Sequence, residues 1–199
     1  FYTLKTRSVA KETEDAVTII FEIPQELKDK FRFKQGQYLN LKLNLNGEEF
    51  RRSYSIMNAP GDGNPDLEIL VKEMEHGTVS KFLNNELKTG DTLEVQQPMG
   101  NFNTHYHPSN KKTYIGLAAG SGISPVLSNL KESLHQEPNA TAYLFFSNRS
   151  EATILKKSEI EDLVVKFNGR LTVVYILSRE KHKENDLFEG RISPEKLNQ

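Results

Sequence analysis

Ala118-Ala119-Gly120-Ser121-Gly122-Ile123-Ser124-Pro125 is the stretch that decides the fold of the second half of the chain. It follows an apolar segment, residues 113–118, and opens a segment with helical spacing, which predicts a strand, a tight turn and a helix in succession. Ser124 is expected as the N-cap of that helix and Pro125 as its first residue. Two glycines let a ligand approach the backbone, and free N–H groups at a helix start attract anions. The stretch indicates a phosphate-binding turn or, as the simpler alternative, a turn without a ligand, because Pro125 replaces the third glycine of the usual dinucleotide fingerprint.

The segments after this turn continue the alternation. Apolar spacing predicts helices at 125–135 and 156–167 and strands at 141–147 and 171–177. Strand–helix alternation at this rhythm is typical of a parallel sheet with crossover helices. Three parallel strands make a thin α/β domain, so we expect this domain to be incomplete at its C-terminus.

The first half of the chain has the period of two that is typical of β-strands. Asn46-Gly47 is the dipeptide that best supplies a tight hairpin turn. Six short strands with one helix between the last two predict a small antiparallel Greek-key β-barrel. The strands for which the pattern gives bounds are 17–23, 39–45, 50–57, 67–71 and 93–95, and the helix is 78–87. With a boundary in the polar stretch 108–112, the fold class is α+β then α/β: a barrel domain over 1–108 and a partial parallel-sheet domain over 109–199.

Composition excludes several classes of function. The 199 residues include 26 Lys+Arg and 27 Asp+Glu, so the formal net charge is −1. This balance does not indicate binding to nucleic acid or to an anionic membrane. The absence of cysteine excludes thiolate metal sites, cysteine nucleophiles and iron–sulfur ligation within these residues. His105 and His107 lack a third ligand nearby, so no metal site is expected. We expect a soluble cytoplasmic protein with neither nucleic-acid nor membrane partners.

Two stretches of the barrel half carry candidate ligand contacts. In Arg52-Ser53-Tyr54-Ser55, strand alternation places Arg52 and Tyr54 on one face, which suits a phosphate and an aromatic ring but also describes an ordinary exposed strand. Gly77-Thr78-Val79-Ser80 opens the predicted helix and suits an anion, with Thr78 as a simple N-cap as the alternative.

The ends of the second and third parallel strands carry the remaining candidates. Ser147-Asn148-Arg149 and Ser178-Arg179 each combine a hydroxyl or amide with a guanidinium, which suits a 2′-phosphate better than a bare ribose. The alternative is that both arginines are solvated surface charges.

Arg52-Ser53-Tyr54-Ser55, Gly77-Thr78-Val79-Ser80 and the stretch 120–125, in this order, resemble the ferredoxin–NADP reductase superfamily over nearly the whole chain. Val71-Lys72 and the segments 87–91 and 145–150 are most similar to the reductase components of phenylacetyl-CoA oxygenases, with other multicomponent oxygenase reductases close behind. The resemblance implies a flavin-binding barrel followed by an NAD(P) domain.

The resemblance also implies roles for single residues. Arg52 would hold the flavin pyrophosphate, Tyr54 would pack on the flavin ring, and Ser55 would lie near the hydride-accepting nitrogen, which makes Tyr54 and Ser55 the catalytic candidates. The other implied cofactor contacts are Ser53, Val71, Lys72, Gly77, Thr78, Val79, Ser80, Gly120, Ser121, Gly122, Ile123, Ser124, Pro125, Asn148, Arg149, Ser178 and Arg179.

The implied activity is hydride transfer from NADPH, with NADH as the alternative, to FAD, with FMN less favoured. Single electrons would then pass to an iron–sulfur domain or an oxygenase component. Family members continue into a Cys-Gly motif, and the oxygenase reductases also into an iron–sulfur domain; this sequence contains neither, so we expect a C-terminally truncated chain. The alternative is a non-catalytic flavin-binding module or an electron-transfer subunit of a larger complex.

Overall fold

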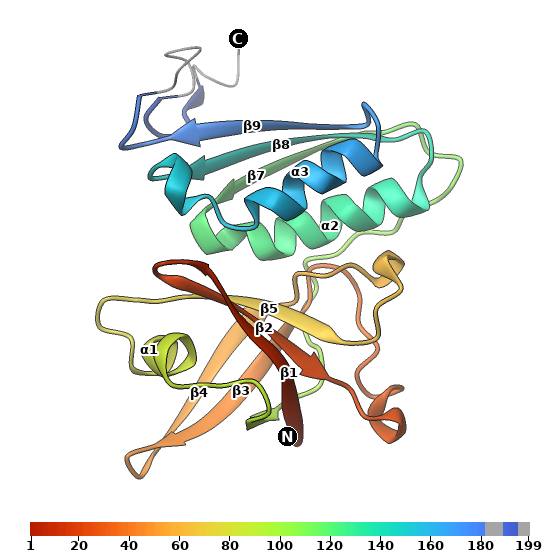
Figure 1. Cartoon of the computed structure of the whole chain (residues 1–199). Coiled ribbons are helices and arrows are strands. Elements are labelled where there is room, and N and C mark those ends of the chain that lie inside the picture. Colours follow the sequence, from red (N-terminus) through yellow and green to blue (C-terminus); the bar gives the residue numbers. More distant parts are fainter. Residues whose placement is uncertain (182–188, 195–199) are drawn as a thin grey trace.

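The computed structural model describes residues 1–181 and 189–194, which form an antiparallel half and a parallel half stacked on each other (Figure 1). Six strands make up the antiparallel half, in the order β4-β3-β6-β1-β2-β5. The non-consecutive neighbours β2–β5 and β3–β6 give it the predicted Greek-key connectivity. The strands are β1 (Tyr2–Thr13), β2 (Ala16–Glu22), β3 (Tyr38–Leu45), β4 (Glu48–Ser55), β5 (Leu67–Lys72) and β6 (Thr92–Val95).

Strand β1 is the element for which the sequence pattern gave no bounds. Its register with β2 shifts between Thr6 and Ser8 and again between Lys11 and Thr13. Each shift places an extra residue in one strand and reverses the alternation of side chains, so that a period of two is lost along β1.

The core of the antiparallel half follows the predicted alternation. Leu39, Leu41 and Leu43 of β3 point inward and are buried together with Ile19 and Phe21 of β2. Asn46 and Gly47 both have positive φ in the β3–β4 turn, as the sequence predicted. Helix α1 (Thr78–Asn85) ends two residues before the predicted end and buries Val79 and Leu83.

The parallel half confirms the predicted order of elements. Strands β7 (Thr113–Ala119), β8 (Thr141–Asn148) and β9 (Leu171–Leu177) pair in parallel in this order. Helices α2 (Ile123–Gln136) and α3 (Lys157–Lys166) both lie on the sheet face that looks toward the antiparallel half (Figure 1). The core of the parallel half therefore includes Ala16, Met57 and Leu70 from the antiparallel half.

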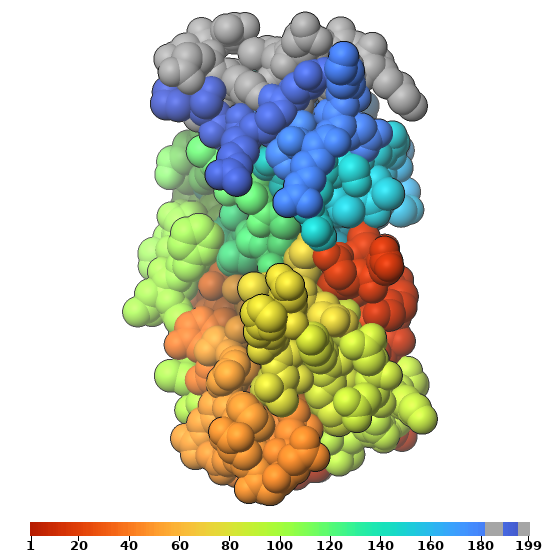
Figure 2. Space-filling model, turned by 90° about the vertical axis from the view of Figure 1, so that its left-hand side faces the viewer, coloured from red at the N-terminus to blue at the C-terminus, as the bar shows by residue number. Residues whose placement is uncertain are grey.

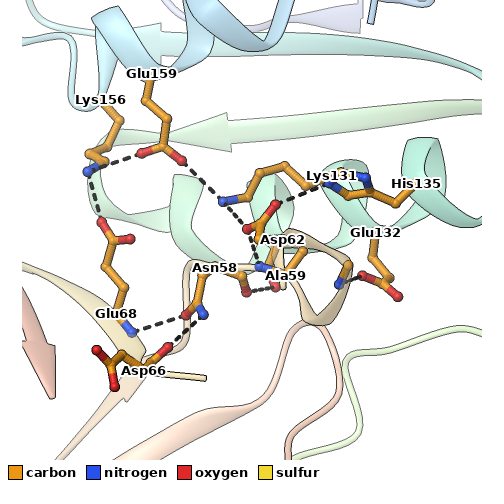
Figure 3. Close-up of polar contacts among 12 residues, drawn as sticks. Asn58, Ala59, Asp62, Asp66, Glu68, Lys131, Glu132, His135, Lys156 and Glu159 are labelled. Atoms are coloured by element: carbon orange, nitrogen blue, oxygen red, sulfur yellow. Dashed lines mark hydrogen bonds and ion pairs between the residues drawn. The ribbon is translucent and has the colours of Figure 1, made fainter. Parts of the chain in front are cut away.

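The two halves are also joined by charged side chains. Lys131 and Lys156 from the parallel half contact Asp62, Glu68 and Glu159 (Figure 3). Lys156 also contacts Glu12, and we call these six residues the interface ion network. Burial opposes the charged form of Lys156, yet the carboxylates of Glu68 and Glu159 outweigh it and raise the pKa of Lys156. Among the described residues, no helix combines the length and the apolar character that crossing a membrane requires.

Candidate functional site

The first candidate site lies where the antiparallel sheet closes on itself. Its edge strands β4 and β5 meet through the isolated bridge Ile56–Ile69, next to which Met57 N–H donates to the Glu68 carbonyl at 2.8 Å. Beside this contact is a cavity of about 310 Å³, which we call the seam cavity. It is lined by Arg52, Ser53, Tyr54, Leu70, Lys72, Met74, Gly77, Val79, Ser80 and Ser121.

The strand β4 presents Arg52 and Tyr54 on one face. They pair in register with Leu41 and Leu39, which are buried, so both side chains lie on the inner face of the sheet. Tyr54 is half-buried, and burial raises its pKa to about 12 against a smaller lowering effect of Arg52. The phenol is therefore neutral at physiological pH. An aromatic face beside an exposed guanidinium fits a flavin ring and its phosphates.

The two serines of this stretch lie on the other face. Ser53 Oγ donates to Asn40 Oδ1 at 2.6 Å, and Ser55 is half-buried opposite Tyr38. Ser55 is not among the residues that line the seam cavity. Its assignment to the hydride-accepting edge of the flavin stays a prediction.

The start of α1 forms the opposite wall of the seam cavity. Gly77 is the N-cap and Thr78 is the first helical residue and exposed, so the alternative of Thr78 as N-cap is wrong. Ser80 Oγ accepts the N–H of Met74 at 3.0 Å and donates to the Gly77 carbonyl at 3.2 Å, which closes the turn before the helix. A Cβ at Gly77 would lie 2.3 Å from Ser80 Oγ, so this tight turn requires glycine. Val79 packs in the core.

The glycine turn 120–125 differs from the prediction in its cap. Gly120–Gly122 form a 3₁₀ turn, Gly122 is the N-cap, and α2 begins at Ile123. The predicted N-cap role of Ser124 and first position of Pro125 are therefore wrong by two residues. The reason is that the 3₁₀ turn runs directly into the helix, and Ser124 Oγ donates back to the Ser121 carbonyl at 3.2 Å.

The second candidate site lies at the carboxyl ends of the parallel strands, where open α/β sheets bind ligands. A cavity of about 390 Å³ opens there, which we call the sheet-edge cavity. It is lined by Lys72, Ala119, Gly120, Ser147, Asn148, Arg149, Thr153, Ser178, Arg191 and Ile192. Asn148 is 6% exposed, and its Nδ2 has no hydrogen-bond partner among the residues that the structure describes. A buried donor without an acceptor, beside three cations, fits an oxygen-rich anion such as a nucleotide phosphate.

The structure distinguishes the two arginines that the sequence treated alike. Arg149 lines the sheet-edge cavity and forms an ion pair with Asp15 in the β1–β2 turn. Arg179 is exposed and is not a lining residue, although its backbone N–H donates to the Arg149 carbonyl at 2.8 Å.

Several lining and neighbouring residues were missed by sequence reasoning. Thr153 and Arg191 line the sheet-edge cavity, and Leu70 and Met74 line the seam cavity. Leu70 and Met74 lie close to the predicted Val71-Lys72 pair along the chain. Extending that prediction by one residue before the pair and two after it would have included both. Val71 itself is buried in the core, whereas Lys72 lines both cavities.

Models of two oxidoreductase domains match the two halves of the chain. The oxidoreductase FAD-binding domain model matches residues 4–104, and the oxidoreductase NAD-binding domain model matches residues 117–199. The chain belongs to the oxidoreductases with an FAD-binding domain followed by an NAD-binding domain, the ferredoxin–NADP reductase family, which confirms the resemblance and the predicted fold class.

Among curated relatives, the chain is similar to a component of the 1,2-phenylacetyl-CoA epoxidase of Escherichia coli, with 38% identity over 99% of this chain and 54% of the relative. It is also similar to the ferredoxin reductase component of 3-ketosteroid-9-alpha-monooxygenase of Rhodococcus rhodochrous, with 36% identity over 87% of this chain and 48% of the relative. The chain thus spans about half the length of the curated relatives it matches.

Solved structures share the fold over nearly the whole chain. The CS-b5R domains of human Ncb5or in the NAD⁺ form align with a TM-score of 0.84 and 25% identity, covering 99% of this chain and 57% of that one. The ferredoxin NADP⁺ reductase of Neisseria gonorrhoeae with bound FAD and NADP aligns with a TM-score of 0.79 and 22% identity, covering 99% of this chain and 75% of that one.

Proposed function

We propose that this chain is the flavin- and nucleotide-binding part of a reductase that transfers hydride from NADPH to FAD. The observation that carries the proposal is the junction of the two cavities. Lys72 lines both of them, and the neighbouring residues Gly120 and Ser121 line one each, so ligands in the two cavities would meet at this turn. When bound, NADPH supplies a hydride and FAD accepts it and releases single electrons. NADH and FMN are the alternative cofactors.

On the flavin side, the proposal assigns binding and orientation to the seam cavity. Arg52 would hold the pyrophosphate by charge-assisted hydrogen bonds, and the neutral Tyr54 ring would pack on the flavin. Ser53 would hold β4 against β3 through its hydrogen bond to Asn40. Ser55 would lie near the hydride-accepting edge of the flavin. The α1 start, Gly77-Thr78-Val79-Ser80, would close on the pyrophosphate, with Ser80 holding the turn in shape. Lys72 would line the cavity, and Val71 would support it from the core.

On the nucleotide side, the proposal assigns the sheet edge. The turn Gly120-Ser121-Gly122-Ile123-Ser124-Pro125 would bring backbone N–H groups to the nicotinamide nucleotide. Asn148, Arg149 and Ser178 would contact its phosphate and ribose oxygens, and Arg179 would contact a 2′-phosphate from outside the cavity.

The proposed acceptor is an iron–sulfur centre or an oxygenase component, as in phenylacetate degradation. The names of the relatives support this, since they describe a component of an epoxidase and reductase components of monooxygenases. We also propose a domain boundary between residues 108 and 109. The gap between the matched segments 4–104 and 117–199 supports it. A cytoplasmic location stays a prediction from the sequence.

The test is an absorbance spectrum of the purified chain with FAD, before and after anaerobic addition of NADPH. Flavin bands that bleach support the reductase. Bands that persist contradict hydride transfer by this chain and favour the alternative of a flavin-binding module. A chain that shows no flavin bands once unbound FAD has been removed contradicts the flavin site itself.

A further inference from the structure

The turn between β1 and β2 places one carboxylate between two cations from different halves of the molecule. Asp15 Oδ2 lies 3.2 Å from Nζ of Lys72, the last residue of β5. The same oxygen accepts a hydrogen bond from Nη2 of Arg149, the residue that follows β8. Figure 2 shows the β1–β2 turn, in red, in contact with the segment after β8, in cyan. A single oxygen of Asp15 therefore receives donors from both cations.

Both of these cations line the sheet-edge cavity, and the cavity has the character of an anion site. Arg191 also lines it, and the buried Asn148 Nδ2 is a donor for which residues 1–181 and 189–194 supply no acceptor. Within the described part of the chain, its lining contains no carboxylate. Asp15 is therefore a negative charge that reaches the cations of this cavity from outside its lining.

Asp15 is held as an anion. Burial alone would raise its pKa, but the hydrogen bond from Thr13 Oγ1 (3.0 Å) and the contacts with Lys72 and Arg149 outweigh burial, and the pKa of Asp15 is lowered. At neutral pH the carboxylate uses N–H donors of the kind that a phosphate oxygen would use.

Resting on the proposed function, we propose that Asp15 is an internal counter-ion of the nucleotide site. Its carboxylate competes with the nucleotide phosphates for Arg149 and Lys72 and so lowers the affinity of the site for phosphate groups. Asp15 acts through these two cations and does not contact the ligand.

The test measures binding of 2′,5′-ADP to the FAD-loaded chain by isothermal titration calorimetry. Asp15→Asn frees both cations, and we expect the dissociation constant to fall about fivefold, the size of effect that a partly exposed ion pair can have. We also expect it to depend more steeply on salt, because the freed cations interact more strongly with phosphate. Asp15→Glu is expected to restore the wild-type affinity.

The matched control is Glu14→Gln, which removes the same charge from the neighbouring residue. Glu14 is exposed, and its side chain forms no ion pair with the described residues. The double variant Asp15→Asn with Arg149→Gln should lose most of the gain. Asp15→Ser also removes the carboxylate and should lower the dissociation constant by a similar factor. It replaces Asp15→Asn in the test if the asparagine variant does not fold.

The outcomes separate this inference from the proposed function. If the wild-type chain binds 2′,5′-ADP, and Asp15→Asn binds no more tightly than Glu14→Gln, the inference is overturned while the nucleotide site stands. If no variant binds, Asp15→Asn included, the inference and the nucleotide part of the proposed function are both overturned.

Discussion

Lys131 Nζ lies 3.1 Å from Asp62 Oδ2, although the two residues belong to different halves of the molecule. Lys131 projects from α2, its side chain is only 4% exposed, and its second partner is Glu159 at 3.1 Å. Asp62 lies in the loop before β5, where its carboxylate also accepts the Ala59 N–H at 2.8 Å (Figure 3). This pair joins α2 to the loop that leads into β5, the strand that ends at Lys72.

Removing the buried ammonium should destabilise the whole molecule. Lys131→Met removes the ammonium beside Asp62, while Glu159 keeps Lys156 as its remaining counter-ion at 3.0 Å, and we expect a loss of about 3 kcal/mol in the free energy of unfolding. Chemical denaturation measures it, with the exposed Lys111→Met as the control. Equal stability of the two variants would show that the contacts of Lys131 contribute nothing to stability.

Gly36 is a second point of contact between the halves. It has φ +72, and a Cβ there would lie 1.9 Å from the Phe102 carbonyl oxygen and 2.5 Å from Asn129 Nδ2. Gly36→Ala should therefore cost more than about 2 kcal/mol of stability. Gly47→Ala is the matched control, because Gly47 has φ +84 but nothing within 4 Å of a Cβ, and it should cost only about 1 kcal/mol. Similar losses in thermal denaturation would contradict the close packing at Gly36.

The buried carboxylate of Glu137 should make stability depend on pH. It accepts the His107 N–H at 3.0 Å, the Tyr114 hydroxyl at 2.8 Å and the amide of Asn110. Burial alone would raise its pKa, but these hydrogen bonds outweigh burial and the pKa of Glu137 is lowered from its ordinary value of 4.5.

A lowered pKa in the folded state means that the stabilisation is complete above pH 4.5 and is lost as the pH falls through the folded-state value. Glu137→Gln should therefore unfold at a lower temperature than the wild-type chain at pH 7, and the difference should shrink below pH 4.5. Melting temperatures measured from about pH 3 to about pH 8 check this. A difference that stays constant with pH would rule out the carboxylate as its cause.

Most elements were predictable because their patterns are local. Leu39, Leu41 and Leu43 alternate without interruption, and β3 was predicted within one residue. Strand β1 was not, because its two register shifts interrupt the period of two. The capping error at Ser124 has a similar origin, since a 3₁₀ turn that continues into a helix leaves no sequence mark at the start of the helix.

The site was predictable only as far as its motifs are contiguous. Arg52, Tyr54, Gly77 and Ser80 were named from the sequence, and the structure brings them to one cavity. The partnership of Asp15 with Arg149 was not predictable, because 134 residues separate them and an aspartate in a turn needs no distant partner to explain it. Contacts between the halves depend on how the halves stack, which local patterns do not encode.

Ser55 should matter for chemistry more than for binding. It is half-buried at the end of β4, beside the Ile56–Ile69 bridge. We expect Ser55→Ala to slow flavin reduction by NADPH about tenfold or more, and to change the FAD dissociation constant less than about twofold, because a lost transition-state hydrogen bond lowers rate without lowering ground-state affinity. Anaerobic stopped-flow absorbance gives the rate and fluorescence titration the affinity. Equal effects on both, or on neither, would refute the assignment.

The central claim, that the seam between β4 and β5 binds FAD, is tested most directly by titrating FAD into the flavin-free chain. Arg52 lines the seam cavity, whereas the adjacent Arg51 pairs with Glu49 at 2.8 Å and does not line it. Arg52→Ala should weaken FAD binding about tenfold or more, the loss expected for one charge-assisted phosphate contact, and Arg51→Ala should leave it within about twofold of the wild-type value. Equal affinities of the two variants, or no FAD binding by the wild-type chain, would contradict the claim.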